Sequence, residues 1–214
     1  MKAPIVAIDG PAAAGKGTLA RRLAATLGLP YLDTGKLYRA VGRLVLDAGA
    51  DPADTGAATA AARALRPADL ERTDLRGPVA DAAAAAVAAI PGVRAALLDF
   101  QRSFAAERGG VLDGRDIGTV IFPAASAKLF VTASLAERAR RRWNELRAKG
   151  AAPDLATVEA DMRLRDAMDA ARAAAPLRPA EDAMLLDTTD KDPDAAFAEA
   201  LERVRARLAN AGCA

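Results

Sequence analysis

The sequence of 214 residues contains no histidine, and its one cysteine, Cys213, lies next to the C-terminus. The absence of histidine excludes catalysis through a Ser-His-Asp or Cys-His arrangement. A single cysteine cannot form a disulfide within the chain, and it cannot build a cysteine-rich zinc site. Aromatic residues make up only 4% of the sequence, which argues against a nucleic-acid site built on stacked bases.

Long apolar runs are also missing. No stretch approaches the about 18 consecutive apolar residues of a membrane span, and the N-terminal MKAPIVAIDG does not read as a signal peptide. We therefore expect a cytoplasmic protein with no membrane partner. The net charge of +2, with 52% hydrophobic and 27% charged residues, is typical of a globular domain. This balance does not call for nucleic acid as a partner either.

The residues IDGPAAAGKGT (8–18) have the spacing of a phosphate-binding loop. The apolar segment 4–9 predicts a buried strand before the loop, and the leucine and alanine spacing of 16–27 predicts a helix after it. Glycines let backbone N–H groups face phosphate oxygens, and the start of the helix adds its dipole. We predict that the phosphates of a nucleotide are bound by Gly10, Pro11, Ala12, Ala13, Ala14, Gly15, Lys16, Gly17 and Thr18.

Gly17 stands where such loops normally carry the Ser or Thr whose hydroxyl contacts Mg²⁺. The hydroxyl comes one residue later, at Thr18. We therefore expect Mg²⁺ to be held mostly by water and nucleotide oxygens, with Thr18 and Asp113 as the candidate protein contacts. The guanine-reading pattern N-K-x-D is absent from the sequence, which disfavours a GTPase switch.

Strand and helix patterns alternate along the rest of the chain. Further strands are predicted at 31–33, 111–114, 128–133 and 183–189. Helices are predicted at 36–49, 79–89, 135–150, 154–173 and 192–209. This order predicts an α/β fold, a three-layer P-loop domain whose parallel five-stranded sheet is flanked by helices.

Arginines cluster between residues 138 and 172, and no lone carboxylate stands out as a base. A hydroxyl acceptor usually needs a carboxylate base, whereas a phosphate acceptor is already largely ionised near neutral pH. A phosphate acceptor needs cations instead, which hold two repelling anions in line. The composition of this region therefore favours a nucleoside monophosphate as the acceptor.

Four motifs occur in an order that resembles the bacterial cytidylate kinases. They are the loop G-x-P/A-x-x-G-K-G-T, present here as GPAAAGKGT (10–18), LDTGKLYR (32–39), DGRDIGTVIFP (113–123) and RLRDAMDAAR (163–172). The resemblance runs from the loop to LLDTT near residue 189. It implies ATP-dependent, Mg²⁺-assisted phosphorylation of CMP and dCMP in pyrimidine nucleotide metabolism. We expect the enzyme to be a monomer. The resemblance also implies one domain over 1–214, whose core comprises residues 1–50, 109–134 and 180–214. A shortened acceptor-binding region would occupy 51–108, and the lid and arginine helices would occupy 135–173.

The resemblance implies roles for residues on the acceptor side. Thr34 and Arg39 would hold the acceptor phosphate, together with Arg115. Arg102 and Asp116 would read the base, since a carboxylate can accept the N4 hydrogen of cytosine.

The resemblance also assigns the last arginine motif. Arg165 and Arg172 would bridge the donor and acceptor phosphates, while Asp169 would hold the ribose hydroxyls. The spacing of these three residues predicts one helical face. The residues expected to stabilise the transferring phosphoryl group are Lys16, Arg115, Arg165 and Arg172.

Arg138 and Arg142 are spaced i, i+4 at the start of the helix predicted at 135–150. By resemblance they would cover the adenine and phosphates of ATP as a short lid, whose closure expels water. The alternative for this arginine run is an ordinary solvated helix face.

The sequence departs from the family pattern at three places. Lys36 replaces a small residue, Ala85 stands where a serine helps to read the base, and 63–78 leave little room for the family's small β-insertion. One alternative function is that of another small kinase, which would act on UMP, AMP or a small metabolite such as shikimate. Two others are a regulatory or nucleic-acid-binding module and a non-catalytic homologue.

Overall fold

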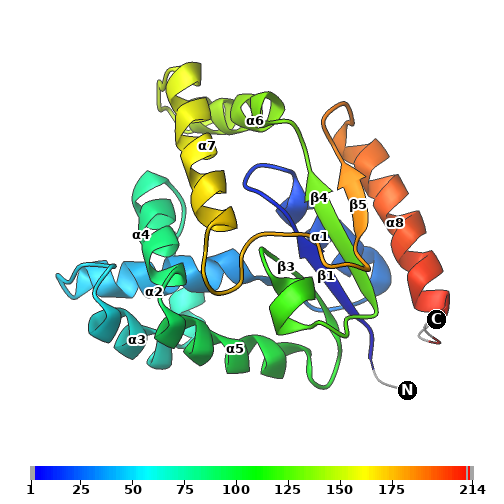
Figure 1. The fold of residues 1–214 in the computed structure, drawn as a ribbon, viewed down its shortest axis with the longest axis horizontal. Helices are drawn as coiled ribbons and strands as arrows, with labels where there is room; N and C mark the ends of the chain where they lie inside the picture. The colour runs from blue at the N-terminus through cyan, green and yellow to red at the C-terminus, as the bar shows by residue number, and fades with distance from the viewer. Residues whose placement is uncertain (1–2, 211, 213–214) are drawn as a thin grey trace. The chain divides into compact units, whose positions relative to one another are not determined.

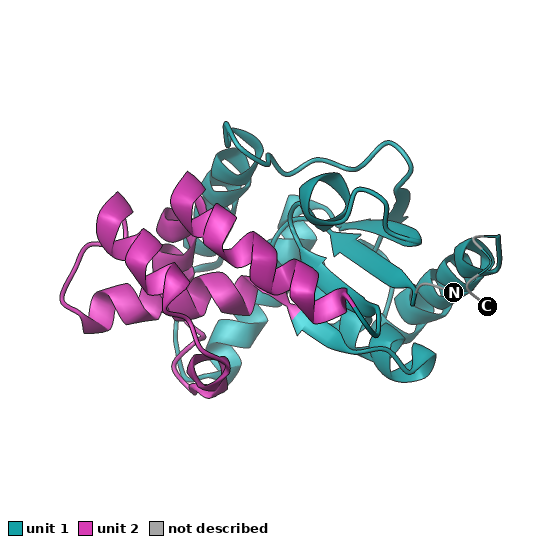
Figure 2. Ribbon diagram, turned by 90° about the horizontal axis from the view of Figure 1, so that it is seen from below, with its two compact units in different colours: residues 1–32, 107–214 teal, residues 33–106 magenta. Residues whose placement is uncertain are grey.

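The chain divides into two compact units in this computed structural model, which describes residues 3–210 and 212. The first, here called the sheet unit, comprises Met1–Leu32 and Glu107–Ala214, and the second, the helical unit, is Asp33–Ala106 (Figure 2). The expected core segments fall in the sheet unit, except for residues 33–50. Most of the helical unit corresponds to the region expected to bind the acceptor.

Five strands form a sheet in the order β2-β3-β1-β4-β5 (Figure 1). The strands are β1 (Ile5–Asp9), β2 (Tyr31–Asp33), β3 (Gly110–Gly114), β4 (Ala127–Thr132) and β5 (Met184–Asp187). β1 pairs in parallel with both β3 and β4, and β4 pairs in parallel with β5. The register sets Asp9 opposite Gly114 on one side and Phe130 on the other. The strands are parallel, so residues after their carboxyl ends gather at one edge.

The sequence of β1 explains its central position. Val6, Ala7 and Ile8 have no exposed surface, as expected for a strand with neighbours on both sides and cover on both faces. Val6 and Ile8 pack with Leu23 and Val204 in the main hydrophobic core. Only the last residue of the strand, Asp9, is ionisable, and it too is buried.

The helices of the sheet unit begin and end at recognisable signals. They are α1 (Lys16–Leu27), the single π-turn η2 (Ile117–Ile121), α6 (Leu135–Ala148), α7 (Leu155–Ala170) and α8 (Pro193–Asn210). Gly28 ends α1 with φ of 66°, a conformation that glycine adopts at low cost. Ser134 and Asp154 cap α6 and α7, because each side chain accepts a hydrogen bond from the backbone N–H three residues on.

The helical unit contains only helices after Asp33, as far as the structure describes it. These are α2 (Thr34–Asp47), α3 (Thr55–Arg63), the 3-10 turn η1 (Pro67–Glu71), α4 (Pro78–Ala88) and α5 (Pro91–Ala105). The alanine-rich run forms α4, as predicted, and between residues 64 and 77 the structure describes one helical element, η1.

No single described helix is long and apolar enough to cross a membrane. α4 and α5 reach the required length and composition only as a pair, which is bent by 99°.

α2 and α4 approach closely at Gly42. A Cβ added there would lie 2.8 Å from the Cβ and 2.9 Å from the carbonyl carbon of Ala83. Gly42 is thus needed for packing, since no rotamer change moves a backbone atom aside.

Gly42→Ala should therefore destabilise the protein by about 1–3 kcal/mol, the usual cost of overpacking, although alanine is the better helix former. Urea unfolding measures the change. The matched control is Gly56→Ala in α3, where the added Cβ would meet only the side-chain oxygen of Asp54, at 3.3 Å. The control should be neutral within about 1 kcal/mol. Equal stability of both variants would contradict the packing argument.

Candidate active site

The loop between β1 and α1 has the backbone of a phosphate-binding loop. Gly10 and Gly15 have φ of 146° and 88°, which side chains other than glycine rarely adopt. A Cβ on Gly10 would lie 1.9 Å from the carbonyl oxygen of Val131. At the start of α1 the capping residue Gly15 provides no side-chain hydrogen bond, so an anion can accept from the first N–H groups of the helix.

Lys16 is buried in the loop, with 6% of its surface exposed. Its Nζ donates a hydrogen bond of 2.6 Å to the carbonyl oxygen of Pro11. Burial, followed by the positive charge of Arg115, lowers the pKa of Lys16 to about 7, although the carboxylates of Asp113 and Asp9 oppose this shift. The amino group is thus close to losing its proton, and a phosphate group beside it would restore the charge.

Arg115 and Asp116 follow β3, and their surroundings differ. Arg115 Nε donates to Asp169 Oδ2 at 2.8 Å, and its Nη1 lies 3.4 Å from the carbonyl oxygen of Gly114. Asp116 is 5% exposed and caps η2 through its backbone. The sheet unit thus holds a guanidinium and a buried carboxylate at the carboxyl edge of the sheet, next to the loop.

Asp169 joins Arg115 to Arg172. The carboxylate is 2% exposed, and it accepts hydrogen bonds from Arg115 and from Nη2 of Arg172. Burial raises the pKa of Asp169, but the charges of Arg115 and Arg172 outweigh that effect and hold it below its ordinary value. Asp169 therefore stays ionised and keeps the two arginines together. The field of Arg165 also acts on both Asp169 and Lys16.

The expected single helical face is wrong for Arg172. α7 ends at Ala170 with Ala171 as its cap, so Arg172 lies beyond the helix. The chain turns there because the N–H of Leu177 donates to the carbonyl oxygen of Asp169 at 2.9 Å. Arg172 nevertheless reaches Asp169 by its ion pair.

Arg138 does not lie on a solvated helix face. Its side chain is 7% exposed, and its Nη2 forms an ion pair with Asp166 at 2.7 Å. Its Nε donates to the carbonyl oxygen of Ala133 at 2.9 Å, and Nη1 lies 3.4 Å from that of Ala12 in the loop. Arg142 pairs instead with Glu145 at 2.9 Å. Arg138 thus ties α6 and α7 to the phosphate-binding loop.

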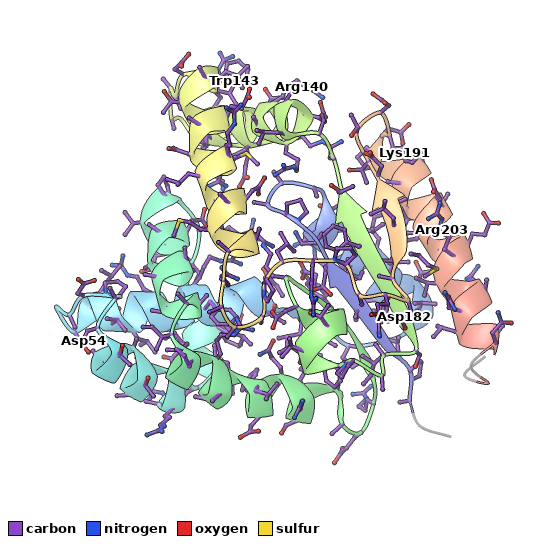
Figure 3. The ribbon with its side chains drawn as sticks, in the orientation of Figure 1. Asp54, Arg140, Trp143, Asp182, Lys191 and Arg203 are labelled. Atoms are coloured by element: carbon purple, nitrogen blue, oxygen red, sulfur yellow. The ribbon has the colours of Figure 1, made fainter. Side chains whose placement is uncertain are left out.

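α6 and α7 form a small hydrophobic cluster of their own. Ala139, Val158 and Met162 are its buried members, and Trp143 packs against them together with loop residues Ala12 and Ala13. Trp143, labelled in Figure 3, donates from its indole N–H to the carbonyl oxygen of Pro153 at 2.9 Å. These contacts fix both arginine-bearing helices against the loop.

The sequence motifs did not indicate three residues that support the site: Arg141, Thr188 and Asp9. Arg141 donates to the hydroxyl and the carbonyl oxygen of Thr188 at 3.0 and 2.6 Å. The Thr188 hydroxyl lies 3.2 Å from the carbonyl oxygen of Ala14 and 3.0 Å from that of Thr132, and it can donate to one of them at a time. Asp9 could have been noticed as a carboxylate at the end of an apolar strand.

Asp113 is the described carboxylate that best fits a role beside Mg²⁺. Its Oδ1 accepts from the Tyr31 hydroxyl at 2.8 Å, and its Oδ2 lies 3.8 Å from where a Cβ on Gly17 would be. Thr18 is exposed in the first turn of α1. The described residues hold no cluster of three metal-binding side chains. This sparse set fits Mg²⁺, which usually keeps several waters and takes one or two carboxylates.

The remaining acceptor-side residues belong to the helical unit. Thr34 is buried in the first turn of α2, where Asp33 accepts from the N–H of Lys36 at 3.0 Å. Arg39 pairs with Asp33 at 2.8 Å, and its buried Nε has no hydrogen-bond partner among the described residues.

Gly35 leaves space for Arg39, because a Cβ on Gly35 would lie 2.9 Å from Arg39 Nη1. The Nζ atom of Lys36 lies 4.0 Å from Oε1 of Glu71. Arg102 is exposed near the end of α5.

The glycine loop, its helix and the buried cations together define a P-loop phosphotransferase. The family model described as cytidylate kinase matches residues 6–206. The chain therefore belongs to the cytidylate kinase family.

Curated cytidylate kinases are similar in sequence to almost the whole chain. A cytidylate kinase of Granulibacter bethesdensis is 62% identical over 201 residues, which cover 94% of this chain and 96% of the relative. One of Paramagnetospirillum magneticum is 64% identical over 201 residues, covering 92% and 95%. The crystal structure of a gluconokinase from Sinorhizobium meliloti 1021 superimposes with a TM-score of 0.50 at 13% identity, covering 98% of this chain and 94% of that one. At that identity the last match shows the fold alone.

ATP binding should take up a proton above pH 7. The lowered pKa leaves Lys16 largely neutral near pH 8 in the free protein, and the phosphates of ATP favour its charged form. Calorimetric titrations in buffers of different ionisation enthalpy should give an uptake approaching one proton near pH 8 and much less near pH 6. Lys16→Arg, which stays charged throughout, should abolish the uptake. Unchanged uptake in that variant would refute the assignment.

Proposed function

We propose that this protein transfers the γ-phosphoryl group of ATP to the phosphate of CMP or dCMP, giving ADP and CDP or dCDP. The observation that carries the proposal is the buried Asp116, set next to Arg115 in the D-G-R-D turn beside the phosphate-binding loop. Membership of the cytidylate kinase family supports the same acceptor. In this proposal the enzyme acts as a cytoplasmic monomer, without nucleic acid or membrane.

The donor side of the proposal uses residues 10–18. Backbone N–H groups of the loop and of the start of α1 bind the phosphates of ATP. Lys16 leaves the carbonyl oxygen of Pro11 and places its charge on the outer phosphates. Arg138 and Arg142 complete the donor site from α6.

Bound Mg²⁺ would neutralise part of the charge on the phosphates. Asp113, with Thr18 beside it, is the residue of this chain that would hold the ion, largely through water.

The transfer step needs no protein base, because the acceptor phosphate is already an anion. The barrier comes from bringing two anions together and from charge spread over the transferring oxygens. In the proposal Arg115, Arg165 and Arg172 meet these charges, and Asp169 keeps Arg115 and Arg172 in place while meeting the ribose hydroxyls. Thr34 and Arg39 also hold the acceptor phosphate.

Base selection follows from hydrogen-bond polarity. The Asp116 carboxylate can only accept when ionised, so it suits the N4 amino group of cytosine and repels the O4 of uracil. Arg102 would donate to the N3 or O2 acceptor of the base. Ala85 in α4 contributes no hydrogen bond from its side chain, so selection rests on fewer contacts than the family pattern provides.

An acceptor panel tests the proposed reaction. ADP release with CMP or dCMP should exceed that with UMP or AMP by about tenfold or more, since one polar base contact discriminates by ~1–3 kcal/mol. A coupled assay at saturating ATP measures all four acceptors. Equal rates with all of them, or no turnover with any, would contradict the proposal.

Asp116→Asn should reduce the preference for CMP over UMP. The amide can turn its NH₂ toward the O4 of uracil, so the ratio of kcat/KM values should fall about tenfold or more. Asp194→Asn is the matched control, because it makes the same chemical change at a side chain that is 88% exposed. The control should keep the wild-type ratio. If Asp116→Asn kept it as well, Asp116 would not read the base.

A further inference from the structure

Asp9 connects two segments that are far apart in the sequence. It ends β1 with 4% of its surface exposed. Its Oδ1 accepts from the N–H of Ile117 at 2.8 Å, and its Oδ2 accepts from the N–H of Gly118 at 2.7 Å. A buried carboxylate is costly unless it is hydrogen-bonded, and here both oxygens are used on consecutive amides. The two hydrogen bonds of Asp9 therefore form a bridge from β1 to the turn after β3.

The turn that Asp9 holds is the π-turn η2. Single π-turns are rare and are frequent at functional sites. The first N–H groups of any helix lack partners within it, and the hydrogen bonds inside η2 begin with Val120, whose N–H donates to the carbonyl oxygen of Asp116 at 2.9 Å. The earlier N–H groups, those of Ile117 and Gly118, donate their hydrogen bonds to the Asp9 carboxylate. Asp9 thus caps η2 from another part of the chain.

Gly118 fits this bridge closely. A Cβ on Gly118 would lie 3.3 Å from Asp9 Oδ2 and 3.1 Å from the Cδ of Lys128. Lys128 is itself held, because its Nζ donates to the carbonyl oxygen of Pro123 at 2.6 Å and to Asp182 at 2.7 Å. Gly118 therefore lies close to two side chains that are themselves held by hydrogen bonds, and η2 has little freedom to shift.

The residues before η2 are the ones that the proposed function uses. Asp116 is adjacent to Ile117, and Arg115 precedes it. A rotation of the peptide between Asp116 and Ile117 would re-aim the Asp116 side chain, and a two-point hydrogen bond opposes such a rotation better than a single one. Among the described residues no hydrogen bond joins the Asp9 side chain to residues 10–18, and its action on Lys16 there is electrostatic.

We propose that Asp9 is a positioning residue for acceptor selection: by capping η2 at two amides it holds Asp116 and Arg115 in the orientation that recognises CMP. Asp9 touches neither substrate. This inference rests on the proposed function, because the roles of Asp116 and Arg115 do.

The ionised form of Asp9 is the one that can cap both amides. Burial raises the pKa of Asp9 to about 6, helped by the charge of Asp116 and opposed by the two hydrogen bonds and by Lys16. At pH 7.5 the carboxylate is thus mostly ionised. An asparagine keeps the shape but offers one acceptor and turns an NH₂ donor toward an N–H.

The test compares Asp9→Asn with the wild type in the intact enzyme at pH 7.5. KM for CMP should rise about tenfold and the CMP-to-UMP ratio of kcat/KM should fall about tenfold, as for loss of one buried hydrogen bond. The Kd for ATP is measured by calorimetry in Gly118→Ala, which disturbs the bridge but keeps the Asp9 charge that acts on Lys16, and it should stay within about threefold. Loss of ATP binding in Gly118→Ala equal to its loss in KM for CMP, or an unchanged ratio in Asp9→Asn, would overturn the proposal.

Two further variants separate positioning from folding. Leu208→Ala removes a core side chain of α8, 6% exposed, and should lower stability while leaving KM and the ratio unchanged. Gly118→Ala disturbs the same bridge and keeps the Asp9 charge, so it should lower the ratio as well. If Asp9→Asn does not fold, Gly118→Ala decides: an unchanged ratio overturns the proposal.

The same assay distinguishes a failure of the proposed function from a failure of the proposed role of Asp9. A wild type that does not prefer CMP to UMP refutes the proposed function. A wild type that prefers CMP, beside variants of the bridge that keep this preference, refutes only the role of Asp9.

Discussion

The burial of Lys16 beside other positive charges is the constraint on which this site depends. Burial, followed by the charge of Arg115 and with a smaller contribution from Arg165, lowers the pKa of Lys16 to about 7. The carboxylates of Asp113 and Asp9 oppose this shift in the pKa of Lys16 but do not cancel it. Polyphosphate bound to the loop would supply the missing negative charge, so the strain in the free protein is also the source of affinity for a nucleotide.

The carboxylates of the sheet unit serve mainly to hold cations and backbone in place. Asp169 joins Arg115 to Arg172, and Asp166 holds Arg138 against the loop. This division of labour suits transfer between phosphates, where the acceptor needs no base and the cations must be correctly spaced. It also explains why a site so rich in arginine can be buried: each charge that leaves water gains a partner or a carbonyl oxygen.

Local patterns predicted most of the fold, whereas contacts between distant segments were beyond them. The glycine spacing and the apolar run before it identified the loop and its flanking elements, because those signals lie within 25 residues. The helix predicted to 173 was wrong because AARAAAP favours helix by propensity, while the N–H of Leu177 bonds back to Asp169 and ends it. The partners of Asp9, Ile117 and Gly118, lie more than 100 residues away, so nothing in the local sequence indicated them.

The central claim is that the γ-phosphoryl group passes directly from ATP to the phosphate of a cytidine nucleotide. The most direct measurement follows ATP labelled with radioactive phosphorus at the γ position, with CMP as the only acceptor. The account predicts that the label appears in CDP, in equal amount to the ADP formed. Label released as inorganic phosphate, with CMP unchanged, would contradict it.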